Sequence, residues 1–138
     1  MRVVVDTNIL LSALINPHGV PAQLIDLWRA QRFVLVTSRD QLLELGEVAR
    51  RPILRRYIVP SRMGRFINDL RELAEVLRNL PSVDRSRDPG DNFLLSMAEA
   101  IDADYLATGD KHDVLSLKTH RRTRIVNARE LLGVLIAS

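Results

Sequence analysis

The sequence has no cysteine, few aromatic residues and only two lysines, and each shortage excludes a class of protein or site. Because there is no thiol, the chain forms no disulfide and has no thiolate ligand, so a bound metal must be held by oxygen or imidazole. Aromatic residues make up 4% of the chain, which argues against an RNA binder that stacks bases on an aromatic sheet. Any bound nucleic acid would be gripped through its backbone.

The sequence also lacks a long apolar run. No stretch approaches the roughly 18 apolar residues that a membrane-spanning helix needs. Met1 and Arg2 lead directly into the apolar residues 3–5, without the longer apolar core of a signal peptide. We therefore expect no membrane anchor and no signal peptide, and a cytoplasmic location is the expectation that follows.

The residues that are present have the composition of a globular protein. Hydrophobic residues make up 46% and charged residues 27% of the 138 residues, so we expect a single domain over residues 1–138 with one hydrophobic core. The net charge is +3, and all but two of the 20 basic residues are arginines. Arginine suits bidentate contacts with phosphate, but an arginine bias also follows from genome base composition or adaptation to heat. Charge alone therefore assigns no partner.

Short apolar runs rich in β-branched residues alternate along the chain with longer segments of helical periodicity. This alternation is typical of an α/β protein with a parallel sheet flanked by helices. We expect strands at residues 2–5, 33–36, 76–77, 105–107 and 124–126. We expect the main helices at residues 39–50, 60–74, 91–101 and after 127, with a polar loop over residues 82–90. Ser38 with Gln41, and Asn127 with Glu130, have the spacing of capping boxes.

Acidic residues follow two of the expected strands, at the edge of the sheet where α/β proteins bind ligands. Asp6 comes directly after the first strand, and Asp110 follows the fourth. Asp91 is expected to open a helix, and Glu44 lies with Glu47 on one face of the helix after the second strand. Each acid has a structural alternative, since aspartate often caps a helix and glutamate often lies on a solvated helical face.

Several carboxylates at one edge of a sheet repel one another unless a cation lies between them. Oxygen-only ligation with retained waters suits Mg²⁺, and Mn²⁺ tolerates the same ligands, so we expect one of these two ions as the cofactor. Such a site supports phosphodiester hydrolysis, because the ion activates water and neutralises charge on the leaving oxygen. The acids therefore predict a metal-dependent hydrolase of nuclease type.

In their order and spacing, these residues resemble a PIN domain over nearly the whole chain. The matching motifs are Val-Val-Val-Asp-Thr-Asn-Ile-Leu at residues 3–10, Ser38 with Glu44, Arg-Asp-Pro-Gly-Asp-Asn at residues 87–92, and Thr-Gly-Asp at residues 108–110. More narrowly, residues 88–98 and the Thr-Gly-Asp-Lys segment are similar to PIN toxins of toxin–antitoxin pairs, the relatives of the VapC toxins.

The PIN resemblance implies a three-layer α/β/α fold with strand order 3-2-1-4-5, and Mg²⁺- or Mn²⁺-dependent cleavage of RNA. Carried over by position, the catalytic and metal-binding acids are Asp6, Glu44, Asp91 and Asp110. Supporting positions are Asn8, Ser38, Thr108 and Asp88, and Asp113 is a further acid nearby. The toxin resemblance also implies a homodimer or higher homo-oligomer and a small antitoxin protein that covers the acidic crevice.

Several alternatives stay open. The chain could be an RNA-processing nuclease with no antitoxin, or a non-catalytic RNA-binding or protein-interaction module that keeps the acids for its fold or partner contacts. A haloacid-type phosphatase needs a second aspartate where Asn8 stands, and a receiver needs a lysine after its last strand, where none occurs. Lys118, Arg121 and Arg122 follow the fourth acid and are expected to meet substrate phosphates, with a solvated loop as the alternative.

Overall fold

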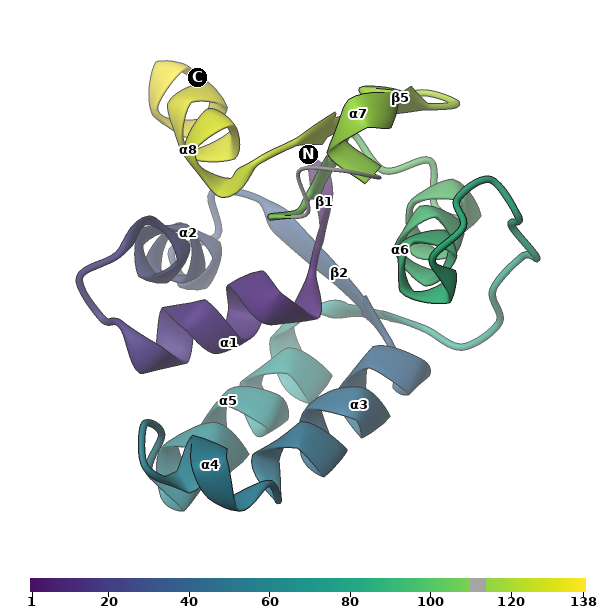
Figure 1. The fold of residues 1–138 in the computed structure, drawn as a ribbon. Coiled ribbons are helices and arrows are strands. Elements are labelled where there is room, and N and C mark those ends of the chain that lie inside the picture. Colours follow the sequence, from purple (N-terminus) through teal and green to yellow (C-terminus); the bar gives the residue numbers. More distant parts are fainter. Residues whose placement is uncertain (110–113) are drawn as a thin grey trace.

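One sheet of six strands runs through the part of the chain that the structure, a computed structural model, describes: residues 1–109 and 114–138 (Figure 1). The strand order is β3-β2-β1-β4-β6-β5. The strands are β1 Arg2–Val5, β2 Val34–Ser38, β3 Glu75–Leu77, β4 Tyr105–Ala107, β5 Thr119–His120 and β6 Thr123–Val126. From β3 to β6 all neighbours are parallel, and β5 pairs antiparallel with β6.

This order confirms the predicted α/β fold with strand order 3-2-1-4-5, in which β6 is the fifth parallel strand. β1 lies at the centre because it is apolar on both faces, and Val3, Val4 and Val5 are at most 2% exposed. It pairs in register with β2 on one side and with β4 on the other. Because the strands are parallel, the residues that follow β1, β2 and β4 come together at one edge of the sheet.

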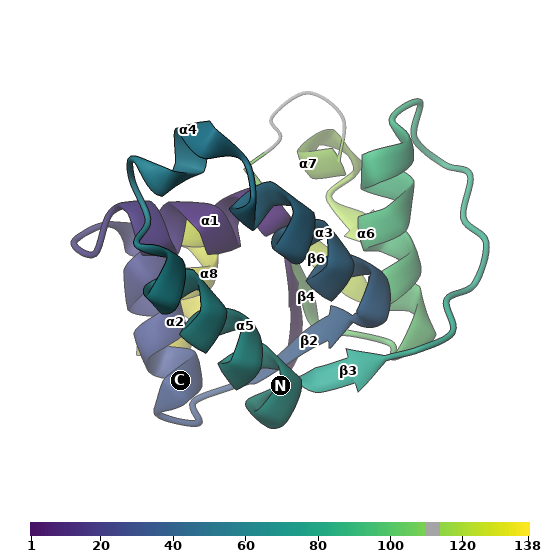
Figure 2. The same cartoon turned by 90° about the horizontal axis from the view of Figure 1, so that it is seen from below.

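Helices cover both faces of the sheet and complete the three layers (Figures 1 and 2). They are α1 Thr7–Ile15, α2 Val20–Arg29, α3 Arg39–Ala49, α4 Pro52–Arg55, α5 Pro60–Leu73, α6 Pro89–Ala100, α7 Val114–Leu117 and α8 Ala128–Ala137. Val3 and Val5 pack with α1 and α2 while Val4 packs with α6, since alternate side chains of a strand face opposite sides. No helix within the described ranges is long and apolar enough to cross a membrane.

Some element boundaries differ from those predicted. β2 ends at Ser38 rather than at residue 36, because its last two residues pair with β3. The prediction that Asp91 opens its helix was wrong: α6 begins at Pro89, is capped by the Asp88 side chain, and carries Asp91 in its first turn. Proline is favoured at such a first helical position, where its missing N–H costs no hydrogen bond. The short β5 and α4 were not predicted, because so few residues show no periodicity.

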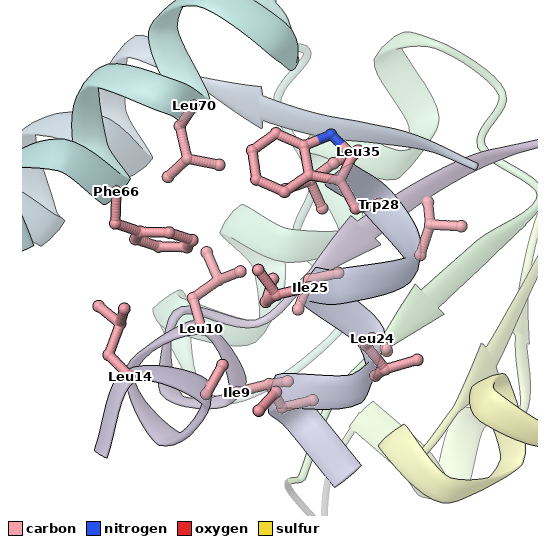
Figure 3. Packing of buried hydrophobic residues seen from close by; sticks show 14 of the residues in the cluster. Ile9, Leu10, Leu14, Leu24, Ile25, Trp28, Leu35, Phe66 and Leu70 are labelled. Atoms are coloured by element: carbon pink, nitrogen blue, oxygen red, sulfur yellow. The ribbon is translucent and has the colours of Figure 1, made fainter. Parts of the chain in front are cut away.

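The larger hydrophobic cluster lies between the sheet and the helices α1, α2 and α5 (Figure 3). Two of its aromatic residues, Trp28 and Phe66, meet edge to face with ring centroids 6.5 Å apart and planes at 86°. The Arg29 guanidinium lies 6.0 Å from the Phe66 ring centroid. Trp28 is only 4% exposed, so the one tryptophan of the chain is a core residue rather than a surface on which a base could stack.

Replacing Phe66 by alanine tests whether this contact carries the core. Phe66 is 1% exposed, so we expect Phe66→Ala to lower the free energy of unfolding by about 3 to 5 kcal/mol, from lost burial and the cavity left behind. Leu73→Ala is the control on the same helix, because Leu73 is 61% exposed and its loss should cost less than about 0.5 kcal/mol. Urea unfolding measures both, and equal losses would contradict the assignment of the core.

Candidate active site

A cleft of about 490 Å³ opens at the carboxyl ends of β1 and β4, between α1, α3 and α6. Figure 2 shows α3 lying between α1 and α6 in the view from below. The described residues that line the cleft are Asp6, Thr7, Asn8, Glu44, Asp88, Gly90, Asp91, Phe93, Leu94 and Gly109. The fold therefore brings together three of the four acids expected at the site, together with Asp88. The fourth, Asp110, lies outside the described residues, as does Asp113.

Asp6 is held in place at the junction between β1 and α1. Its backbone N–H donates to the Ala107 carbonyl at 2.9 Å, which continues the pairing of β1 with β4. Its carboxylate accepts one hydrogen bond from the Asn8 N–H at 3.1 Å and another from the Thr108 hydroxyl at 2.8 Å. Asp6 thus caps α1 and also lines the cleft, so a capping role and a role at the site are compatible for this residue.

Asp91 is the most deeply buried of the described acids in the cleft, with 4% of its surface exposed. Its Oδ2 atom accepts a hydrogen bond from the Ser86 hydroxyl at 3.0 Å. The Asn92 amide holds the loop that carries Ser86, since Asn92 Oδ1 accepts from the backbone N–H groups of Arg85 and Ser86 at 2.9 and 2.7 Å. A buried carboxylate is costly unless hydrogen-bonded, and this loop supplies one donor.

Sequence reasoning missed the roles of Ser86 and Asn92. Asn92 stands next to Asp91 in the motif, but its task depends on how the loop before α6 folds back over the start of that helix. The Asn92 amide also donates to the Ser86 carbonyl at 2.8 Å, so one side chain binds both the backbone N–H and the backbone carbonyl of Ser86. Only the polar character of this loop was visible in the sequence.

Glu44 projects from the middle of α3, and its surroundings contain groups that raise the pKa of its carboxyl and groups that lower it. Burial of the carboxyl is the largest effect and raises the pKa of Glu44, and the negative charges of Asp6 and Glu47 raise it further. A hydrogen bond from the Thr7 side chain and the positive charge of Arg51 lower the pKa but do not cancel the rise. The negative charge on Glu44 is therefore destabilised, and the proximity of Asp6 is part of the cause.

Gln41 joins α3 to the end of β1 through a buried set of hydrogen bonds. Its Nε2 donates to the Val5 carbonyl at 2.8 Å and to the Thr7 hydroxyl at 3.3 Å, and its Oε1 accepts from the Thr37 hydroxyl at 2.6 Å. Thr7 in turn acts on Glu44, because its side chain lowers the pKa of that carboxyl. Gln41 is 1% exposed, so these polar groups have little access to water and depend on one another.

This network corrects the predicted capping box at the start of α3. Ser38 caps the helix as expected, because its hydroxyl oxygen accepts from the Gln41 N–H at 3.1 Å. The reciprocal bond is absent among the described residues, because the Gln41 side chain turns inward to β1 instead. The second predicted box, Asn127 with Glu130, is complete. The reciprocal bond would need Gln41 Oε1 as its acceptor, but this atom accepts from the Thr37 hydroxyl instead, while Nε2 donates to the Val5 carbonyl.

The remaining predicted positions divide between the cleft and other places. Thr108 orients Asp6, and the exposed Asn8 lines the cleft. Ser38 is 1% exposed and does not line the cleft; its hydroxyl is 3.5 Å from the sulfur of Met97.

The structure does not bring Arg121 and Arg122 to the acids. Both precede β6, at the amino end of the sheet, whereas the cleft opens at the carboxyl end. Arg121 pairs instead with Glu99, with its Nε 2.8 Å from the carboxylate. Lys118 lies beside the middle of β6, where its carbonyl accepts from the Ile125 N–H at 2.8 Å.

Gln41→Leu tests the network, because leucine has a similar size but no polar atoms. The Thr37 hydroxyl and the Val5 carbonyl would lose buried partners, so we expect the free energy of unfolding to fall by about 1 to 3 kcal/mol. Gln23→Leu makes the same change at an exposed position of α2 and should alter stability by less than about 0.5 kcal/mol. If urea unfolding gave the same result for both variants, the buried bonds would not stabilise the fold.

Comparison with known proteins places this cleft in a family. Residues 2–112 match the PIN domain, a stretch that contains Asp6, Glu44, Asp91 and Asp110. An uncharacterized protein of Methanocaldococcus jannaschii is 31% identical to the chain over 128 residues, which cover 92% of this chain and 81% of that protein. PIN domains are generally nucleases. The acids of the cleft, the strand order and the match over most of the chain are all consistent with this family. The chain belongs to the PIN domain family.

Proposed function

We propose that this protein is a metal-dependent ribonuclease that hydrolyses phosphodiester bonds of RNA in the acidic cleft, with Asp6, Glu44, Asp91 and Asp110 as its acids. One observation carries the proposal. Carboxylates that follow β1 or lie on α3 and α6 line one cleft, and neither lysine nor arginine is among the described residues that line it. Several carboxylates that line one cleft repel one another, and a divalent cation held between them for phosphodiester hydrolysis would offset that repulsion.

The donors in the cleft fit Mg²⁺ or Mn²⁺, which bind oxygen ligands and keep waters in their shell. Within the described residues, no three histidine or acidic side chains lie together as a metal site, and Asp110 is outside them. The proposed ligands are therefore Asp6, Asp91, Glu44 and Asp110, with water completing the shell. A bound ion would supply a more acidic water and offset negative charge on the leaving oxygen.

The protein's own groups have separate tasks in this proposal. Hydrogen bonds from Asn8 and Thr108 hold the Asp6 carboxylate, and a hydrogen bond from Ser86 holds that of Asp91, so both present fixed oxygens to the cleft. Glu44 lines the cleft from α3 and would offer a further carboxylate oxygen to the ion or to a water in its shell. Asn8 is placed to orient a water or a phosphate oxygen at the rim.

A role as the toxin of a toxin–antitoxin pair is the narrower form of this proposal. It rests on the motif resemblance, and so do the homodimer or higher homo-oligomer, the small antitoxin and the cytoplasmic location. An RNA-processing nuclease with no antitoxin would use the same cleft. A non-catalytic RNA-binding module is less consistent with the site, because carboxylates that line a cleft repel a phosphate backbone unless a cation lies between them.

Asp6→Asn tests catalysis, because it removes one negative charge and keeps the volume of the side chain. With Mg²⁺ or Mn²⁺ and labelled single-stranded RNA, we expect wild-type cleavage, its loss in EDTA, and a rate at least about a hundredfold lower in the variant. Asp102→Asn is the matched control, at an exposed position remote from the cleft with a φ of 48° that asparagine tolerates well. Equal rates for Asp6→Asn and wild type would rule the proposal out. Cleavage of DNA but not of RNA would show that the protein is a nuclease with DNA, rather than RNA, as its substrate.

Glu44→Gln tests the electrostatics of the cleft through stability rather than activity. Burial raises the pKa of Glu44 above its ordinary value of 4.5, so its ionised form destabilises the fold. This cost is absent below pH 4.5 and grows as pH rises through the raised pKa. In EDTA, Glu44→Gln should therefore unfold at higher urea than wild type at pH 7, with the difference disappearing at lower pH.

Metal should reverse this order of stability. A cation that binds the folded wild type stabilises it by mass action, and the variant with one fewer carboxylate gains less. Saturating Mn²⁺ at pH 7 is thus expected to raise the urea midpoint of wild type above that of Glu44→Gln. If the midpoint of wild type did not respond to Mn²⁺, the cleft would not be a metal site.

A further inference from the structure

Arginines are concentrated in one part of the chain next to the cleft. Between Glu47 and Asp69 the sequence has six arginines and no acidic residue. This part comprises the end of α3, the whole of α4 and the first turns of α5, and Figure 1 shows these helices together at one end of the molecule. We call residues 50–57, with α4 at their centre, the arginine lobe. Its arginines are Arg50, Arg51, Arg55 and Arg56.

The guanidinium groups of the lobe are available for a partner. All four arginines are exposed. Within the described part of the chain, no hydrogen bond or ion pair engages the side chains of Arg50, Arg55 or Arg56. Other arginines differ: Arg62 donates to the Leu14 carbonyl at 2.9 Å, and Arg29 pairs with an aspartate. Unpaired charges of one sign on a few consecutive turns repel one another, and a polyanion would relieve that repulsion.

The lobe begins at the rim of the acidic cleft. Arg50 caps α3 six residues after Glu44, a distance of about 9 Å along the helix axis. Arg51 lies near enough to Glu44 for its charge to act on that carboxyl. A strand whose phosphodiester lies among the acids therefore has its neighbouring phosphates within reach of positive charge on the same helix.

The lobe also presents apolar surface between its arginines. Ile53 and Tyr57 are each 61% exposed, although the rest of the chain buries most of its large apolar side chains. An exposed tyrosine among arginines is a typical surface for single-stranded RNA, because a base can stack on the ring while guanidinium groups contact the phosphates. Tyr57 is the only exposed aromatic side chain among the described residues, and it lies beside these arginines.

We propose that the arginine lobe binds the phosphate backbone of the RNA strand that leaves the acidic cleft, with Tyr57 as a stacking surface for one base. The choice of RNA as the ligand rests on the proposed function. The lobe takes the role that the sequence suggested for Lys118, Arg121 and Arg122, whose hairpin lies at the opposite end of the molecule (Figure 1). The cleft thus positions the bond to be cut, and the lobe holds the flanking strand.

Two triple variants with the same loss of charge test the proposal. The lobe variant is Arg50→Gln/Arg55→Gln/Arg56→Gln. The control variant, at exposed positions of β6, α8 and the turn before β6, is Arg122→Gln/Arg124→Gln/Arg129→Gln. Binding of fluorescein-labelled single-stranded RNA is followed in EDTA, where metal-dependent hydrolysis does not consume the probe, over a series of salt concentrations. Thermal unfolding verifies that both variants fold.

We expect the lobe variant to bind RNA at least about tenfold more weakly than wild type near 0.1 M salt. Its plot of log affinity against log salt should be shallower by about 2, because each neutralised phosphate of a single strand contributes about 0.7 to the slope. The control variant should stay within about threefold of wild type, because it removes the same charge from exposed arginines outside the lobe. Tyr57→Leu should weaken binding about fivefold or more with an unchanged salt slope.

Three results would exclude the lobe as an RNA-binding surface. They are equally weakened RNA binding in the two triple variants, unchanged RNA binding in the lobe variant, and no RNA binding by wild type. Cleavage of the same RNA in Mn²⁺ separates this proposal from the ribonuclease proposal. If wild type binds RNA through the lobe but does not cleave it, the proposed role of the lobe is supported and the ribonuclease proposal is contradicted. If wild type cleaves RNA but the lobe variant binds RNA as tightly as wild type, the ribonuclease proposal is supported and the proposed role of the lobe is contradicted.

Discussion

The burial of β1 between β2 and β4 is the constraint on which the rest of the structure depends. β1 contributes apolar side chains to both hydrophobic clusters, so it tolerates neither a shift in register nor a polar face. Its parallel neighbours then fix where the chain turns, and Asp6 and Thr108 come within 2.8 Å although 102 residues separate them. The network of Gln41 adds α3 to the same junction through the Val5 carbonyl. The cleft is therefore a product of strand pairing before any side-chain chemistry enters.

Charge is distributed unevenly along the helices that line the cleft. Asp6, Asp88 and Asp91 lie at or within the first turn of α1 and α6, where the free N–H groups and the helix dipole favour negative charge. Glu44 lies in the middle of α3 and has no such support, so burial and its acidic neighbours raise its pKa. Arg50 and Arg51 follow the end of α3, so positive charge comes directly after the acids Glu44 and Glu47 along the chain. In the proposed function, this order would give a bound RNA strand a direction across the surface.

Much of the fold was predictable because its signals are local. The apolar residues 3–5, the helical stripe of α5 and the complete box of Asn127 with Glu130 each depend on a few adjacent residues. The convergence of Asp6, Glu44 and Asp91 was predictable because parallel strands bring their ends together. The inward turn of Gln41 and the hold of Asn92 on its loop were not, since both depend on which distant carbonyl or N–H lies opposite. The arginine lobe was also not predicted, because pairing and exposure decide which of many arginines are free.

The two outer strands limit how copies of this chain can join. On one side the sheet ends in β3, with three residues, and on the other in β5, with two, turned antiparallel to its neighbour. Edges this short expose too few unpaired N–H and C=O groups for another chain to extend the sheet, which is how many proteins avoid edge-to-edge aggregation. Any stable association between copies must accordingly use helical surfaces, and its strength would depend on side-chain packing rather than on backbone hydrogen bonds.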